Sequence, residues 1–195
     1  MNKLKDFILM IITCSLIISC SANLDDYDNL SSRESSKTTD KPFDIKEYFD
    51  GDVIAWGTVQ DYSEQVTRRF CVEIVGTWQG NEGVLAEKFY FDDGEISFRN
   101  WQLSKKSDGS YHGTAGDVVG TAIGNHQGFA FQFQYTLSLV VDDETYEVAM
   151  DDWMYQLDEY RVMNKTTMSK FGVNVAEITL FFDKETQVQT CPIRT

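Results

Sequence analysis

Two adjacent aspartates, Asp151 and Asp152, interrupt an apolar run and are followed at once by Trp153. A close pair of carboxyl groups is what glycosidases and aspartic proteases use for acid–base chemistry. Neighbouring residues of a β-strand point to opposite faces, however, and the flanking alternation predicts a strand here. We therefore expect one aspartate exposed and the other facing inward, paired with a cation such as Arg161 or Lys170.

A second candidate for chemistry is the pair Glu87 and Arg99, which flanks the turn sequence FDDGE at 91–95. A three-residue loop with Gly94 in the left-handed bulge position sets Glu87 opposite Arg99. A two-residue loop would set Lys88 against Arg99, and like charges disfavour that register. The charge pair then shares a face with apolar residues: Leu85, Phe89, Phe91 and Trp101. This indicates either a buried ion pair or a polar mark inside a cavity.

Two histidines are the remaining candidates for metal chemistry. His112 and His126, with Asp117, have the residue types of a zinc site, but their spacing matches no compact zinc motif. No nucleophile motif of the GxSxG or Cys-His kind is present in the sequence. We expect no metal and no cofactor.

Residues 1–19 predict a lipoprotein signal peptide. A basic start precedes an apolar core of about a dozen residues, which is too short to span a membrane as a helix. The core ends in Leu-Ile-Ile-Ser before Cys20, a lipobox in which the cysteine thiol accepts a diacylglycerol. Residues 20–42 would then be the lipidated cysteine and a flexible polar tether. Ser21, where an aspartate would favour the inner membrane, indicates the periplasmic face of the bacterial outer membrane.

Two cysteines remain after processing, Cys71 and Cys191. In an oxidising compartment an even pair is typical of a disulfide, which here would tie the C-terminal tail to an early strand. A buried free thiol at Cys71 is the alternative, and Cys71 could act as a nucleophile only in that state.

Residues 43–195 predict one all-β domain. Alternation with a period of two runs through eight segments: 53–60, 65–76, 83–91, 95–104, 128–141, 144–157, 160–169 and 173–182. Residues 42–49 predict at most one turn of helix. Sequential hairpins joined by Asp- and Gly-rich turns predict an up-and-down antiparallel barrel of about 8–10 strands, because closure removes exposed edges. A barrel of this size encloses either a packed interior or one small-ligand cavity.

Glycine recurs every fourth residue in the segment 111–128, at Gly116, Gly120, Gly124 and Gly128. The segment lacks the residues of a phosphate-binding loop. Such glycines predict tight packing or bends of the barrel, with close approach of a ligand as the alternative. The formal net charge of −14 argues against binding nucleic acid or lying flat on anionic lipid.

Several of these segments together resemble the DUF3833 family of bacterial lipoproteins: FDGDVIAWGTVQD (49–61), GVLAEKFYFDDGEISFRNW (83–101), YHGTAGDVVGTAIG (111–124), DDWMYQLDEYRVMNKTTMSKFG (151–172) and VAEITLFF (175–182). The resemblance implies a lipocalin-like barrel and an outer-membrane location, without an established reaction. It also implies genes often placed near fatty-acyl-modifying enzymes, which favours a lipid ligand. The family often has arginine where this chain has Tyr62 and Lys165, so no role for a fixed cation is carried over there.

The candidate ligand-binding residues are the polar and aromatic side chains of these segments: Glu87, Phe89, Arg99, Trp101, Asp117, Asp152 and Trp153. The favoured hypothesis is a membrane-anchored module that binds a small hydrophobic ligand such as a fatty acid or lysolipid. One alternative is a lipid-modifying enzyme that uses Glu87, Arg99, Asp117 and Asp152. The other is an interaction scaffold whose barrel is filled. The sequence gives no indication of the oligomeric state.

Overall fold

The structure is a computed structural model that describes residues 42–141, 143–186 and 190–191. One helical turn and ten strands make up this part of the chain: α3 (Ile45–Tyr48), β1 (Gly51–Asp61), β2 (Val66–Gln79), β3 (Glu82–Phe91), β4 (Ile96–Lys105), β5 (Tyr111–Thr114), β6 (Val118–Gln127), β7 (Ala130–Val141), β8 (Glu144–Gln156), β9 (Arg161–Lys170) and β10 (Val173–Asp183). The expected signal peptide, the lipidation site Cys20 and the tether lie outside the described residues. Within the described chain, no helix is long and apolar enough to cross a membrane.

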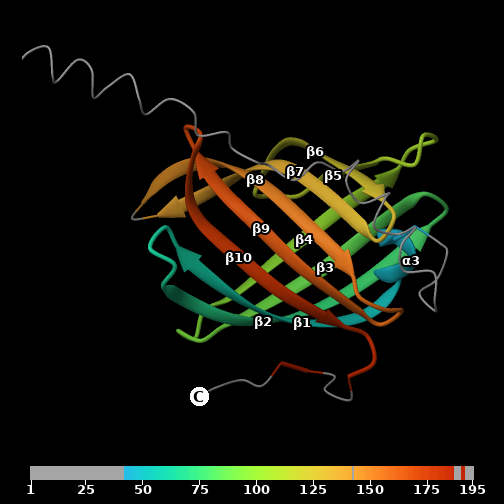
Figure 1. Cartoon of the computed structure of the whole chain (residues 1–195), viewed down its shortest axis with the longest axis horizontal. Helices are drawn as coiled ribbons and strands as arrows, with labels where there is room; N and C mark the ends of the chain where they lie inside the picture. The colour runs from blue at the N-terminus through green and yellow to red at the C-terminus, as the bar shows by residue number, and fades with distance from the viewer. Residues whose placement is uncertain (1–41, 142, 187–189, 192–195) are drawn as a thin grey trace, which may run out of the picture.

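The strands form a closed barrel in which each strand pairs with its neighbours in the sequence (Figure 1). The first and last strands, β1 and β10, pair with each other and close the sheet. Every pairing is antiparallel, so the predicted all-β up-and-down barrel is confirmed. Two of the strands, β5 and β6, lie in the glycine-rich segment, which the eight alternating segments did not include.

Alternation along each strand divides the side chains between the barrel interior and the outer face. On β7, Phe131, Phe133 and Leu137 are buried inside, whereas Gln132 and Gln134 lie on the outer face and contact Asp151 there. The largest buried cluster is rich in aromatic rings and joins the residues in and around α3 to the inner face of the barrel. The hydrophobic effect of filling this interior is what holds the closed sheet together.

The hairpin between β3 and β4 has the register predicted from charge. Glu87 pairs with Arg99, and the Phe91 amide donates to the Glu95 carbonyl at 3.0 Å. Gly94 has φ of +89°, the left-handed region that favours glycine. The three-residue loop is therefore confirmed, and with it the placement of Glu87 and Arg99 on the same inward face.

Helix α3 covers one end of the barrel (Figure 1). The side chain of Asp44 caps its first turn by accepting a hydrogen bond from the Lys46 amide at 3.0 Å. Phe49, just after the helix, packs edge-on against the Phe182 ring with centroids 5.4 Å apart. A Cβ atom on Gly76 would stand 1.5 Å from the Phe49 carbonyl oxygen, so glycine is required for the chain to pack this closely against β2.

A polar cluster fastens this end cap to the wall. Besides Lys46, Asp44 accepts hydrogen bonds from the Tyr111 hydroxyl on β5 and the Lys105 ammonium on β4. Burial alone would raise the pKa of Asp44, but these hydrogen bonds and the charge of Lys105 hold it below its usual value. The Asp44 carboxylate therefore connects the cap to β4 and β5.

The four-residue glycine repeat serves bends and close packing, as one of its two interpretations predicted. Gly120 and Gly128 have positive φ of +73° and +54° at irregular or turning points of the chain. Gly124 lies under the Phe131 ring, where a Cβ atom would come within 2.4 Å. Gly116 lies in the connection between β5 and β6, so the glycines do not share one strand face.

A disulfide joins Cys71 on β2 to Cys191, with the Cα atoms 5.7 Å apart. The bond lies on the outer side of β1 and β2, where Cys191 is buried beside Ile54 and Trp56. The Cys191 amide also donates to a Glu73 carboxylate oxygen at 2.8 Å. The tail is thereby fixed against the outside of the barrel.

Candidate functional site

A cavity of about 120 Å³ lies inside the barrel beyond the end cap. Its walls are mostly apolar, and they come from the cap and from seven strands of the described barrel. An engineered apolar cavity of about 150 Å³ binds a benzene molecule, so the free space here is somewhat smaller than a cavity known to hold one aromatic ring. Besides the Tyr135 hydroxyl, five polar side chains interrupt the apolar lining: Glu87, Arg99, Asp152, Asn164 and Thr166.

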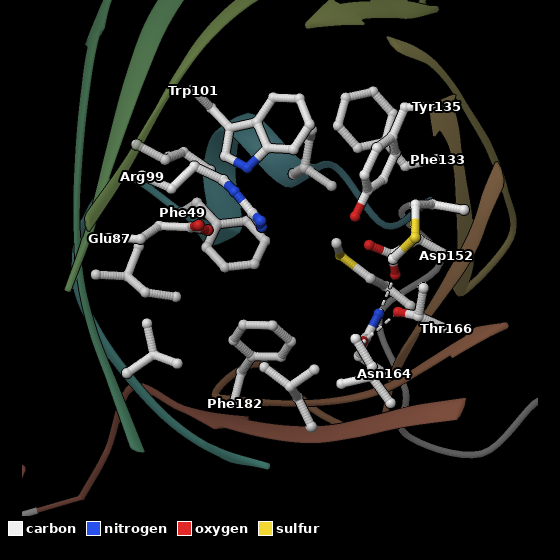
Figure 2. A pocket seen from close by; sticks show the side chains of 18 of the residues that line it. Phe49, Glu87, Arg99, Trp101, Phe133, Tyr135, Asp152, Asn164, Thr166 and Phe182 are labelled. Atoms are coloured by element: carbon white, nitrogen blue, oxygen red, sulfur yellow. Dashed lines mark hydrogen bonds between the residues drawn. The ribbon is translucent and has the colours of Figure 1, made fainter. Parts of the chain in front are cut away.

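Glu87 and Arg99 form one wall of the cavity, from β3 and β4 (Figure 2). The guanidinium of Arg99 lies over the Phe89 ring at 5.6 Å and near the Trp101 ring at 6.0 Å. Its Nε and Nη2 atoms donate to Asp117, at 2.9 Å and 2.6 Å from Oδ2. Arg99 therefore forms its close ion pair with Asp117, while its interaction with Glu87 is a longer-range charge attraction.

Asp117 lies where the pairing between neighbouring strands of the barrel is incomplete. β5 is only four residues long and pairs with β4 over residues 102–105 alone. Among the residues that the structure describes, no strand pairs on that side with the first half of β4, which carries Arg99. The bidentate pair between Arg99 and Asp117 spans this gap, and both side chains stay partly exposed. Asp117 thus holds Arg99 from beside the cavity without lining it.

Asp152, Asn164 and Thr166 form the opposite wall, together with Tyr135 (Figure 2). Asn164 donates through Nδ2 to Asp152, and the Thr166 hydroxyl donates to Asn164 Oδ1 at 3.3 Å and is close enough to Asp152 to lower its pKa. Asp152 is 9% exposed and faces inward, as the alternation predicted. The wall that contains Glu87 and the wall that contains Asp152 therefore face the same small space.

The prediction that the inward aspartate pairs with Arg161 or Lys170 was wrong. Arg161 pairs with Asp158 and Glu185 at 2.8 Å and 2.9 Å, and Lys170 lies over the Tyr146 ring. The physical reason is that Asp152 sits deep in the barrel, whereas both cations lie at strand ends. The cation that does act on Asp152 is Arg99, from the other side of the barrel.

The interior shifts the titration of both carboxyl groups. Burial raises the pKa of Glu87 to about 7, although the positive charge of Arg99 opposes the rise. Burial also raises the pKa of Asp152 to about 6, although hydrogen bonds from Asn164 and Thr166 lower it. Burial likewise raises the pKa of the Tyr135 hydroxyl, so this group stays protonated. The cavity contains two acids that titrate near neutral pH.

Trp153 does not line the cavity. It lies on the outer face of β8 with Asp151, to which its indole Nε1 donates at 3.2 Å. Its ring stacks on Tyr155 at an interplanar angle of 9°. Asp151 is held further by Gln132 at 2.6 Å. The two adjacent aspartates thus lie on opposite faces of β8, and they do not form a carboxyl pair.

Of the other predicted binding residues, Glu87, Phe89, Arg99, Trp101 and Asp152 line the cavity. Tyr135, Asn164 and Thr166 were missed. A usable signal existed for Tyr135, because it continues the inward-facing register of Phe131 and Phe133. Asn164 could have been found as a polar residue on the buried face of β9, between Val162 and Thr166.

The histidines are not gathered into a metal site. His112 pairs in register with Ile123, three residues before His126. Among the residues that the structure describes, no group of three or more potential metal ligands is present. The Nδ1 atom of His126 is buried without a hydrogen-bond partner in the described chain.

A closed up-and-down barrel with a helix across one end and a small apolar cavity containing a few polar groups defines a lipocalin-like protein. The chain belongs to the family described as protein of unknown function (DUF3833), whose model matches residues 14–184.

One solved structure similar to this chain is that of the S-type phycobiliprotein lyase CPES from Guillardia theta. The two share 9% sequence identity with a TM-score of 0.55, over 83% of this chain and 98% of the lyase chain. At this identity the likeness shows the fold alone. No curated protein matches the sequence.

Proposed function

We propose that this protein is a binding module that holds a small hydrophobic or lipid ligand inside its barrel. The observation that carries the proposal is the cavity itself, an apolar space of about 120 Å³ on which a few polar groups converge. Small-molecule sites have this composition, in which apolar walls supply affinity and a few polar groups fix orientation. A scaffold with a filled barrel would have no reason to keep buried charges around free space.

The size of the cavity limits what it holds in its present shape. A ring-sized group fits directly, whereas a longer acyl chain must displace neighbouring side chains. Met150 and Met154 line the cavity, and unbranched methionine side chains repack easily around different shapes. A longer ligand would extend from the cavity toward the barrel end opposite α3, where partly buried hydrophobic side chains such as Leu139 and Val175 surround a small buried cluster.

The proposal also places the barrel at a membrane. The lipobox ending at Cys20 supports a lipid anchor, and Ser21 supports the periplasmic face of the outer membrane. The chain joins the barrel beside the end cap, where the Phe43 amide donates to the Gly128 carbonyl at 2.7 Å. A tether that ends there leaves the other end of the barrel free for ligand access.

The test is native mass spectrometry of the mature chain, residues 20–195 with Cys20→Ser, purified from bacteria without detergent. We expect a bound species whose mass matches an extracted lipid or other small apolar molecule. Leu180→Phe, which adds volume to the cavity lining, should remove the bound species. The matched control Leu157→Phe, on an exposed loop residue, should retain it.

Thermal unfolding of both variants checks that they fold. A clean mass for the unmodified chain, with no uptake of added fatty acids, lysolipids or small aromatic compounds, contradicts the proposal and favours the filled scaffold.

The enzyme hypothesis has one specific observation in its favour. Glu87 and Asp152 have pKa values of about 7 and about 6, in the range where a general acid or base works best at neutral pH. The barrel neighbour is named as a lyase, so the fold is compatible with catalysis. A mass change in the bound ligand after incubation with this chain, lost in Glu87→Gln, would support the enzyme over the carrier.

A further inference from the structure

Acidic groups outnumber basic groups around the cavity. Three carboxyl groups surround a single guanidinium, and Asp117 already neutralises Arg99 through two hydrogen bonds. Glu87 and Asp152 therefore face the cavity without a close cationic partner of their own among the described residues. Among the described residues that line the cavity, no second cation is present to balance them.

One acceptor atom in the cavity wall is unused. The Oε2 atom of Glu87 is buried and has no hydrogen-bond partner in the described chain. A buried acceptor without a donor costs roughly 1–3 kcal/mol, so such an atom is a place where a ligand donor gains affinity. Figure 2 shows the Glu87 carboxyl and the Asp152 carboxyl on facing walls of the same space.

We propose that the ligand of this cavity is an amine, a cation with a ring-sized apolar body whose N–H groups donate to Glu87 and Asp152. This inference rests on the proposed function, and it names the chemical class of the ligand. A fatty-acid carboxylate would add a fourth carboxyl group around one guanidinium, which like charges disfavour. An ammonium group supplies both the missing charge and the missing donors.

The apolar body follows from the shape of the walls. Trp101, Phe133 and Tyr135 form a contiguous aromatic surface, with ring centroids 5.1 Å to 5.7 Å apart. Aromatic faces attract both cations and other rings. Together with the free volume of about 120 Å³, this surface suits one aromatic ring beside the amine.

The preference for an amine should depend on pH. The groups that face the cavity are the carboxyls of Glu87 on β3 and Asp152 on β8, Arg99 on β4 with its partner Asp117, and the Tyr135 hydroxyl on β7. Arg99 and Tyr135 keep their protons throughout the neutral range, because both pKa values are raised. Glu87 and Asp152 are the groups that change, and both become neutral in acid. The affinity for the amine should therefore fall from pH 8 to pH 5.

The test compares three single-ring probes of similar size: benzylamine, benzyl alcohol and benzoate, which are cationic, neutral and anionic at neutral pH. Binding to the mature chain, residues 20–195 with Cys20→Ser, is followed by NMR through the indole N–H signal of Trp101. At pH 8 we expect benzylamine to bind at least about tenfold more tightly than benzoate, with benzyl alcohol between them.

Two isosteric variants locate the effect. Glu87→Gln and, independently, Asp152→Asn should reduce the preference of the chain for benzylamine over benzoate to within about threefold. Glu147→Gln removes the same charge from the exposed face of β8, and it should leave the preference unchanged. An equal loss in Glu147→Gln would show that only the overall negative charge attracts the amine, and that result overturns the proposal.

The remaining outcomes separate this inference from the proposed function. If benzoate binds as tightly as benzylamine, or more tightly, the cavity still binds ligands but the amine assignment is wrong. If none of the three probes shifts the Trp101 signal, the amine assignment fails. If native mass spectrometry also shows a clean mass, the proposed function fails with it.

Discussion

The end of the barrel covered by α3 and the middle of the barrel are built from the same alternating strands. They differ in whether a buried carboxylate has hydrogen-bond partners. At the covered end, Asp44 accepts hydrogen bonds from a backbone amide, a tyrosine and a lysine. In the middle, Glu87 has a buried oxygen with no partner in the described chain. The pKa of Asp44 is lowered, and that of Glu87 is raised to about 7.

The covered end is also packed more tightly than the middle of the barrel. At the covered end, Gly76 lets the Phe49 carbonyl approach the wall more closely than any side chain would allow. In the middle, the side chains leave about 120 Å³ free. The comparison teaches that one region carries the stability of the barrel, while the other keeps unsatisfied groups whose cost a ligand can remove.

The largest effect should come from breaking the covered end. In Gly76→Ala the new Cβ would collide with the Phe49 carbonyl oxygen, so α3 must move away from the wall. We expect the free energy of unfolding to fall by more than about 3 kcal/mol, as overpacking against backbone is costly. Urea denaturation measures the change. Gly116→Ala is the matched control, because a Cβ there meets nothing within 4 Å, and a similar loss in both variants would refute this account.

The next effect should come from the cavity and should depend on pH. Glu87 has a pKa of about 7 in the folded protein and 4.5 as its ordinary value, so the folded state binds more protons between these values. The free energy of unfolding should therefore fall as the pH rises from 5 to 8, by about 3 kcal/mol for this group. Asp152 adds a similar fall that is centred at lower pH.

Glu87→Gln should flatten this dependence and make the protein more stable than the unmodified chain at pH 8. Urea denaturation at pH 5, 6, 7 and 8 gives the required curves, with Glu147→Gln as the control on the exposed face of the sheet. A curve for Glu87→Gln parallel to that of the unmodified chain would mean that Glu87 titrates normally.

The smallest effect should come from the polar cluster that fastens the cap. Asp44→Ala removes the N-cap and leaves the Tyr111 hydroxyl and the Lys105 ammonium without their acceptor. We expect a loss of about 2 kcal/mol, the upper range for an N-cap residue. Because the folded pKa of Asp44 is lowered, its contribution is present near neutral pH and is lost in acid. A loss that was larger at pH 3 than at pH 7 would contradict this assignment.

Much of the fold could be predicted from local pattern because strand alternation and turn chemistry act over a few residues. The register of Glu87 and Arg99 followed from Gly94 and from the repulsion that the other register would create. The strands β5 and β6 were harder to recognise, since glycine carries no side chain to show an inward or outward preference.

The site could be predicted only in part because its contacts join strands far apart in the sequence. Nothing local to Asp152 indicates that Asn164 and Thr166 bond to it, or that Arg99 acts on it across the barrel. Trp153 was included in the site as one of the aromatic side chains, although alternation places it on the face opposite to Asp152. The cavity itself depends on how all the inward side chains fill the space, which no single segment determines.

The disulfide between Cys71 and Cys191 has a topological consequence. With a sequence separation of 120 between its two cysteines, it makes one covalent ring that contains most of β2 and all the strands from β3 to β10. A protease that cuts any single loop in this ring opens the chain without releasing a fragment. The nicked molecule would keep its mass on a non-reducing gel and separate into two pieces only after reduction.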